Sequence, residues 1–289
     1  MTEKSMEARE DQSKKLRLGF STCPNDTFMF DAMVHGKIDT QGLEFEITMA
    51  DILHLNRMAM AGELDVVKVS YNAFGRFRDR YTLLEAGSAM GQGCGPLLIS
   101  AEPTTIDKLR AQNARVAIPG VNTTANLLLS FFAPDLLNRE EMLFHEVMPA
   151  VQAGTAQAGL IIHENRFTYQ QLGLHCVQDL GEYWEAQTGL PIPLGAICAR
   201  TSLGTDTIAR LNQVMHDSVA YAFAHPEASS AFVKQHAQEL SAEVTQAHID
   251  LYVNDFSLDM GDLGHQAVDK LLAVGADMGL YAAPQSSTK

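Results

Sequence analysis

Short apolar runs alternate with stretches of helical periodicity along the first two thirds of the chain. Five runs have the length and composition of buried strands: residues 16–20, 64–70, 97–100, 115–118 and 159–162. Residues 43–49 alternate as a further strand. Helical spacing is found between the strands, in residues 27–35, 51–61, 104–110 and 125–132. Strands and helices that alternate through short connections predict parallel strand pairs with right-handed crossovers. Asn25 or Asp26 is the expected cap of the first helix.

The pattern becomes helical after about residue 200, following a loop and strand at residues 191–199. Four helices are expected there, over residues 207–224, 226–236, 242–252 and 263–278. Two α/β units and a long helical part predict two lobes with a ligand cleft between them. We assign residues 16–102 and 199–289 to a discontinuous lobe 1, residues 103–198 to lobe 2, and residues 1–15 to a disordered tail. This α/β layout is that of type II periplasmic-binding-protein-like folds, and by itself it specifies no chemistry.

Composition limits the partners and the compartment. The chain has 289 residues, 46% hydrophobic and 19% charged, which is typical of a globular protein with a substantial core. A net charge of −14 disfavours a nucleic-acid partner. The 4 cysteines are widely spaced without a CxxC pair, as in proteins of a reducing compartment. The N-terminus lacks the apolar stretch of a signal peptide, and no apolar run reaches membrane-spanning length. We therefore expect a cytoplasmic protein with no membrane partner.

Motifs for a bound cofactor are missing from the sequence. The 10 histidines show no HExxH or comparable ligand spacing, so no metal is expected. No strand–GxGxxG–helix arrangement or Walker pattern is present, so no nucleotide cofactor is expected either.

The segment GLIIHENRFTY, residues 159–169, is the strongest candidate for catalysis. It places His163 directly after a buried strand, and ligands of open α/β sheets bind beyond the carboxyl ends of strands. An imidazole titrates near neutral pH and therefore suits a general base. The alternative is a surface histidine in a loop. Glu164 could orient the imidazole, but we expect it to be solvated.

Two further strand ends carry polar groups that suit a carboxylate. Lys68 and Ser70 are two residues apart and share one face of a strand, where a cation and a hydroxyl form charge-assisted bonds, unless Lys68 simply points outward. Residues 120–125 lead into a helix whose first-turn amides and threonine hydroxyls attract anions, although ordinary capping explains them equally. Asn25 is the best polar candidate after the first strand. A small carboxylate is the expected ligand.

These segments together resemble the 1,4-dihydroxy-6-naphthoate synthases of the futalosine route to menaquinone. The motifs that carry the resemblance are CPNDTFMF (23–30), KVSY (68–71), NTTA (122–125), GLIIHENRFTY (159–169) and GLPIPLGAI (189–197). The similarity covers roughly residues 16–280. Thr22, where relatives often have proline, and the charged N-terminal extension depart from the family pattern.

The resemblance implies a carbon–carbon lyase that converts cyclic dehypoxanthinylfutalosine to 1,4-dihydroxy-6-naphthoate without metal or organic cofactor. It implies that His163 is the proton acceptor. It further implies substrate contacts at Lys68, Val69 and Ser70, and at Thr124 and Ala125.

Two other functions stay open at this point. A chorismate dehydratase of the same pathway would share the architecture and also take a carboxylate substrate. A non-catalytic small-carboxylate binding protein would share the fold, although the missing signal peptide counts against it. The IIHENRFTY segment favours the synthase. The chain is expected to be a monomer or a homodimer.

Overall fold

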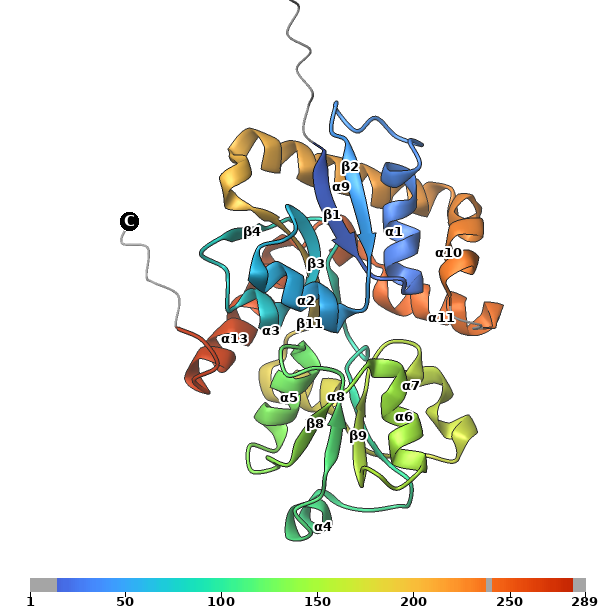
Figure 1. Ribbon diagram of the computed structural model, residues 1–289, viewed down its shortest axis with the longest axis vertical. Coiled ribbons are helices and arrows are strands. Elements are labelled where there is room, and N and C mark those ends of the chain that lie inside the picture. The colour runs from blue at the N-terminus through green and yellow to red at the C-terminus, as the bar shows by residue number, and fades with distance from the viewer. Residues whose placement is uncertain (1–14, 238–240, 283–289) are drawn as a thin grey trace, which may run out of the picture.

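The computed structural model describes residues 15–237 and 241–282, which form two β-sheets in two lobes (Figure 1). The first sheet has the order β2-β1-β3-β11-β4, with β5 also paired to β11. Its strands are β1 (Leu16–Phe20), β2 (Phe45–Met49), β3 (Val66–Ser70), β4 (Tyr81–Leu83), β5 (Ala89–Gly91) and β11 (Ile192–Arg200). The second sheet has the order β10-β6-β9-β7-β8. Its strands are β6 (Leu97–Ser100), β7 (Val116–Ile118), β8 (Arg139–Glu141), β9 (Ala158–Ile161) and β10 (His175–Asp179). The tail predicted for residues 1–15 lies outside the described residues except for Lys15.

Helices cover both sheets. Lobe 1 carries α1 (Pro24–Val34), α2 (Ile52–Ala61), α3 (Tyr71–Phe74), α9 (Thr205–Ala224), α10 (Ser230–His236), α11 (Ala242–Tyr252), α12 (Asp255–Leu258) and α13 (Gly261–Asp277). Lobe 2 carries α4 (Ile106–Ala111), α5 (Thr124–Phe132), α6 (Phe144–Gln152), α7 (Asn165–Thr168) and α8 (Leu180–Thr188). Within residues 15–237 and 241–282, none of the helices is long and apolar enough to cross a membrane.

Central strands are buried along their whole length. Every residue of β3, β6, β7 and β9 is buried, which explains why these strands read as continuous apolar runs rather than as alternating patterns. Edge strands differ: β8 has the sequence Arg-Glu-Glu, and β10 is partly exposed throughout. Because such edge strands bury little apolar surface, the hydrophobic pattern does not reveal them.

Strand direction departs from the expected all-parallel arrangement. β1 pairs in parallel with β2 and β3, as the alternation of strands and helices predicts. However, β11 is antiparallel to β3 and β4, and β6 is antiparallel to both β9 and β10. The crossover rule applies to strands joined by a helix in the same lobe. By contrast, β6 and β11 enter their sheets from the other lobe, so this rule does not set their direction.

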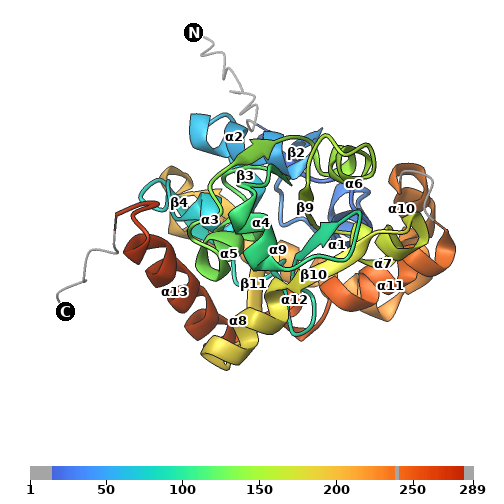
Figure 2. The same ribbon diagram turned by 90° about the horizontal axis from the view of Figure 1, so that it is seen from below.

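The predicted lobe boundaries are corrected by the strand pairing. The chain leaves lobe 1 after β5 and is already in the second sheet at β6, before residue 102. It returns after α8, because β11 belongs to the first sheet from Ile192 onward, before residue 198. Short apolar strands fit either sheet equally well, and so composition alone does not say which lobe each strand joins. Figure 2, seen from the side of lobe 2, shows α4 to α8 around the second sheet.

Candidate active site

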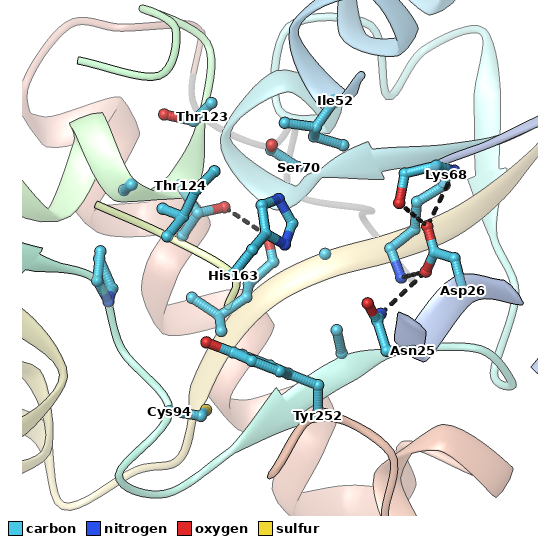
Figure 3. Close-up of a pocket in the computed structure, with 17 residues that line it drawn as sticks. Asn25, Asp26, Ile52, Lys68, Ser70, Cys94, Thr123, Thr124, His163 and Tyr252 are labelled. Atoms are coloured by element: carbon cyan, nitrogen blue, oxygen red, sulfur yellow. Dashed lines mark hydrogen bonds and ion pairs between the residues drawn. The ribbon is translucent and has the colours of Figure 1, made fainter. Parts of the chain in front are cut away.

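A cavity lies between the two lobes, at the carboxyl ends of strands from both sheets (Figure 3). It measures about 630 Å³ when its open mouth is included. Lobe 1 contributes polar side chains from the start of α1 and from the end of β3. Lobe 2 contributes the start of α5, together with Ile162 and His163, which follow the end of β9. An interface between two lobes is a preferred position for a small-molecule site, which makes this cavity the candidate ligand site.

Six of the seven residues predicted to form the site line this cavity. They are Asn25, Lys68, Ser70, Thr124, Ala125 and His163. Val69 does not share their position: its side chain is fully buried in the hydrophobic core, because successive residues of a strand point to opposite faces. The substrate contacts proposed for all seven stay predictions.

Lys68 is not the free cation that its position after apolar residues suggests. Its Nζ donates a hydrogen bond of 2.8 Å to Oδ1 of Asp26, and the two side chains are only 5% and 1% exposed. Asp26 Oδ2 also accepts from Ser21, at 2.7 Å from Oγ and 3.1 Å from the backbone nitrogen. The lysine charge is therefore compensated by a buried carboxylate. Lys68 offers a ligand hydrogen-bond donors rather than net positive charge.

Helix α1 begins earlier than predicted, and this places Asn25 and Asp26 at the cavity. Cys23 is the N-cap without a side-chain capping bond, and Pro24 occupies the first helical turn, where its lack of an N–H costs nothing. Asn25 and Asp26 therefore lie inside the first turn and cap nothing, contrary to the prediction. Instead, Asn25 Nδ2 donates to Asp26 Oδ1 at 3.0 Å. The carboxylate also gains from the positive end of the helix dipole.

The strand pair β3–β11 makes room for the lysine. Gly195 is the register partner of Ser70, and a β-carbon at Gly195 would lie 2.9 Å from Lys68 Cε. Any side chain there would displace the lysine. The Ser70 hydroxyl accepts from Asn56 Nδ2 at 3.1 Å, while the Ser70 amide donates to Asn56 Oδ1 at 2.9 Å. Because a hydroxyl also donates one hydrogen, Ser70 keeps a donor for a ligand.

The start of α5 supplies backbone donors from lobe 2. Thr123 is the cap, and its side chain accepts from the amide of Asn126 at 3.2 Å, so ordinary capping accounts for part of the NTTA motif. The Thr124 hydroxyl donates to the carbonyl of Leu194 in lobe 1 at 2.8 Å. The first-turn amides of Thr124 and Ala125 have no acceptor within their own helix. These amides and the helix dipole therefore favour an anionic or carbonyl oxygen in the cavity.

His163 occupies a constrained turn directly after β9. Its φ is +57°, the left-handed region that costs a residue with a β-carbon about 1–2 kcal/mol. Cys23 Sγ lies 3.6 Å from Nδ1, and the ring of Phe144 packs edge-on at 5.1 Å between centroids. With Nδ1 against the thiol, Nε2 is the nitrogen left for a ligand in the cavity, into which the imidazole projects (Figure 3).

Glu164 is buried, contrary to the expected solvated position. The residue is 8% exposed, and its Oε2 has no hydrogen-bond partner among the described residues. It lines a small separate cavity together with Cys23. Burial first, and then the carboxylates of Glu164 and Asp26, raise the pKa of the Cys23 thiol well above its usual value. The thiol stays protonated near neutral pH, so Cys23 is no nucleophile.

His248, which is part of the same cluster, was missed by reasoning from the sequence. This fully buried residue of α11 hydrogen-bonds through Nε2 to Oδ1 of Asn25 at 2.9 Å. Its ring lies 6.1 Å from that of His163, with only 23° between the planes. Burial, and then the nearby His163 and Lys68, lower the pKa of His248 well below its usual value. Helical periodicity in α11 shows a buried face but not a polar partner on it.

Comparison with known proteins identifies close relatives. The family model described as "Menaquinone biosynthesis" matches residues 16–277. A 1,4-dihydroxy-6-naphthoate synthase of Thermus thermophilus is 48% identical over 268 residues, 92% of this chain and 96% of the relative. A second protein of that name, from Streptomyces coelicolor, is 46% identical over 273 residues, 93% of this chain and 95% of the relative.

Solved structures share the fold of this chain. A crystal structure of an Archaeoglobus fulgidus protein is 35% identical, with a TM-score of 0.87 over 93% of this chain and 99% of that one. The periplasmic aliphatic sulphonate binding protein of Escherichia coli is only 10% identical, with a TM-score of 0.62 over 92% of this chain and 88% of that one. The latter shows the fold alone and confirms the predicted two-lobed, periplasmic-binding-protein-like architecture. The family match and the two close relatives show that this chain belongs to the menaquinone biosynthesis family, as an enzyme akin to the 1,4-dihydroxy-6-naphthoate synthases.

Proposed function

We propose that the chain is a lyase that converts cyclic dehypoxanthinylfutalosine to 1,4-dihydroxy-6-naphthoate, with His163 as the general base. The observation that carries the proposal is the position of His163, which projects from a constrained turn into the cavity between the lobes. The names of relatives 48% and 46% identical to this chain support the choice of product.

The base acts through Nε2, since Nδ1 faces the Cys23 thiol. His163 removes a proton beside a carbonyl of the cyclic substrate. Eliminative cleavage of the sugar-derived part follows, and aromatisation of the product ring supplies the thermodynamic drive. The neighbouring His248 is neutral because its pKa is lowered, so no second imidazolium opposes the charge that His163 gains. A positioned general base contributes roughly 10²–10⁴-fold in rate.

Substrate oxygens are held from both sides of the cavity. Lys68, Ser70 and Asn25 present donors from lobe 1, and the amides of Thr124 and Ala125 do so from lobe 2. Since Asp26 compensates the lysine charge, a substrate carboxylate is attracted by these donors and by the dipole of α5 rather than by a free cation. Closure of the lobes would exclude water and orient the substrate against His163.

The proposal places this reaction in the cytoplasm, in a monomer or a homodimer. Cys23, Cys94, Cys176 and Cys198 are all free thiols in the described structure, which is the state that a reducing compartment maintains.

The direct test is turnover of the substrate by the purified, chelator-treated chain. Anaerobic incubation with cyclic dehypoxanthinylfutalosine should yield 1,4-dihydroxy-6-naphthoate, detected by mass spectrometry, and parallel incubation with chorismate should yield nothing. Turnover of chorismate alone would replace the proposal by the dehydratase. Tight binding of either compound without turnover would leave a binding protein, and activity that returns only on addition of a metal would contradict a cofactor-free reaction.

The role of His163 is tested by His163→Ala, with His145→Ala as the matched control. His145 is an exposed histidine next to Phe144, the same aromatic ring that His163 contacts. We expect His163→Ala to lose about 10²–10⁴-fold in kcat and His145→Ala to keep the parent value. Near-normal turnover by His163→Ala would remove His163 from the mechanism.

A further inference from the structure

A chain of hydrogen bonds leads from helix α11 to the cavity wall. His248 Nε2 bonds to Asn25 Oδ1 at 2.9 Å, and Asn25 Nδ2 donates to Asp26 Oδ1 at 3.0 Å. Lys68 Nζ donates to that same carboxylate oxygen at 2.8 Å. Every member except His248 lines the cavity. Among the described residues, the hydrogen bond to Asn25 is the one that joins His248 to the cavity wall.

We propose that His248 is a positioning residue: it locks the amide of Asn25 so that the cavity meets its N–H group and not its carbonyl oxygen. The lobe 1 wall then selects a substrate oxygen that accepts hydrogen bonds, such as a carboxylate or carbonyl oxygen. This inference rests on the proposed function for the identity of the substrate, but not for the orientation of the amide.

The orientation of Asn25 follows from its two neighbours. An ionised carboxylate only accepts hydrogen bonds, so the atom of Asn25 that faces Asp26 must be Nδ2. The atom that faces His248 is then Oδ1, which only accepts. His248 Nε2 must therefore carry the hydrogen and donate it. One hydrogen of Asn25 Nδ2 is used by Asp26, and the second is left for a ligand in the cavity.

His248 is suited to hold this arrangement because neither its ring position nor its tautomer can change easily. The residue is completely buried, and its ring packs against Tyr252 at 4.6 Å and against His163 at 6.1 Å between centroids. Its Nδ1 is buried without a hydrogen-bond partner among the described residues. A proton on Nδ1 would find no acceptor there. The ring thus stays neutral, with its hydrogen on Nε2.

The consequence for the cavity is a wall of donors. The second hydrogen of Asn25 Nδ2, the ammonium of Lys68 and the hydroxyl of Ser70 all come from lobe 1, and Figure 3 shows Asn25 and Lys68 together around Asp26. A reversed amide would put a carbonyl oxygen among them and would repel an acceptor oxygen of the ligand. A buried site that lacks one matching hydrogen bond loses affinity steeply.

The test compares His248→Gln with His248→Leu. The glutamine amide carries an N–H at about the reach of imidazole Nε2 and can donate to Asn25, whereas leucine fills a similar volume and cannot. We expect His248→Leu to raise KM about three- to tenfold, the range that one hydrogen bond is worth, with kcat little changed. His248→Gln should restore KM to within about twofold of the parent. His225→Leu, at an exposed histidine of the same lobe, controls for loss of a histidine as such.

Binding without turnover provides the second measurement. In the His163→Ala background, the Kd for cyclic dehypoxanthinylfutalosine should rise with His248→Leu by the same factor as KM and recover with His248→Gln. A merely structural role would instead lower stability and kcat together, equally in both variants. Equal KM values for His248→Leu, His248→Gln and the parent protein would overturn the proposal. An equal rise in KM for His248→Leu and His248→Gln would also overturn it.

Nitrogen NMR of ¹⁵N-histidine-labelled protein tests the amide lock without any substrate. His248 should give the neutral tautomer protonated at Nε2 from about pH 6 to about pH 8. A tautomer protonated at Nδ1, or a charged ring, would overturn the proposal even if the leucine variant failed to fold. If the parent protein neither bound nor turned over the substrate, the proposed function would be wrong. The tautomer of His248 seen by NMR would still test the orientation of Asn25, because that measurement needs no substrate.

Discussion

Removal of the Lys68 ammonium should destabilise the protein far more than removal of an exposed lysine. Lys68→Met keeps the apolar stem but leaves the Asp26 carboxylate, only 1% exposed, without its counter-charge. Breaking one side of a buried pair costs about 3–5 kcal/mol. Three donors would remain on Asp26: the hydroxyl and the amide of Ser21, and Nδ2 of Asn25. We therefore expect the lower end, about 3 kcal/mol of unfolding free energy.

The double variant separates charge from packing. Asp26→Asn with Lys68→Met removes both charges at once, and so no ion is left uncompensated. We expect it to be at least about 2 kcal/mol more stable than the sum of the two single variants predicts, the coupling typical of groups in one buried network. Lys15→Met is the matched control: its pair with Glu44 spans 3.8 Å with both side chains more than half exposed. Its loss should cost less than about 1 kcal/mol.

Urea denaturation followed by circular dichroism gives these free energies from midpoints and slopes. A loss below about 1 kcal/mol for Lys68→Met would mean that water reaches the pair and screens it. Additive effects in the double variant would show that Lys68 and Asp26 do not depend on one another. Either result would refute the reasoning.

Three further outcomes concern residues of the cavity wall and His248 behind it. His163→Gly should be more stable than His163→Ala by about 1 kcal/mol, because only glycine adopts a φ of +57° without strain; equal urea midpoints would argue against strain at that turn. Gly195→Ala should cost about 1–3 kcal/mol, since its new methyl group lies 2.9 Å from Lys68 Cε, and an unchanged midpoint would contradict this. The lowered pKa of His248 means that the unfolded chain takes up a proton that the folded chain refuses. Stability should therefore fall as the pH drops below about 6.5, by up to about 1.4 kcal/mol per pH unit, and His248→Gln should flatten that slope in pH-dependent denaturation. Identical slopes in the two proteins would remove His248 as the cause.

Periodicity predicted the elements of this fold better than their pairing. Helix α2 illustrates the part that local sequence encodes: Asp51 caps it by accepting from the amide of Leu53, and Gly62 ends it in the left-handed conformation. Strand β11 illustrates the rest. Its apolar sequence predicts a buried strand. The direction and the partner of the strand depend on where the chain re-enters lobe 1, and the local sequence does not determine this.

The same contrast applies to the site. His163, Lys68 and Ser70 were found from their positions at strand ends, because strand ends of open sheets face the cleft. The partners of these residues were not found. Asp26 is expected from the sequence as a helix cap, and nothing in the helical pattern of residues 242–252 points to His248. A buried hydrogen bond between distant segments does not change the hydrophobic periodicity of either segment. It depends on how the helices and strands pack against one another, which the spacing of residues within each element does not show.

The way β11 completes the first sheet has a consequence for biosynthesis. β3 ends at Ser70, but its central partner β11 begins only at Ile192, after the whole of lobe 2. While the chain emerges from the ribosome, the edge of β3 that pairs with β11 stays unpaired until lobe 2 has been synthesised. Lobe 2, by contrast, is one continuous segment and can fold first. Exposed strand edges of this kind invite aggregation, so the nascent chain is most vulnerable between the synthesis of β3 and that of β11.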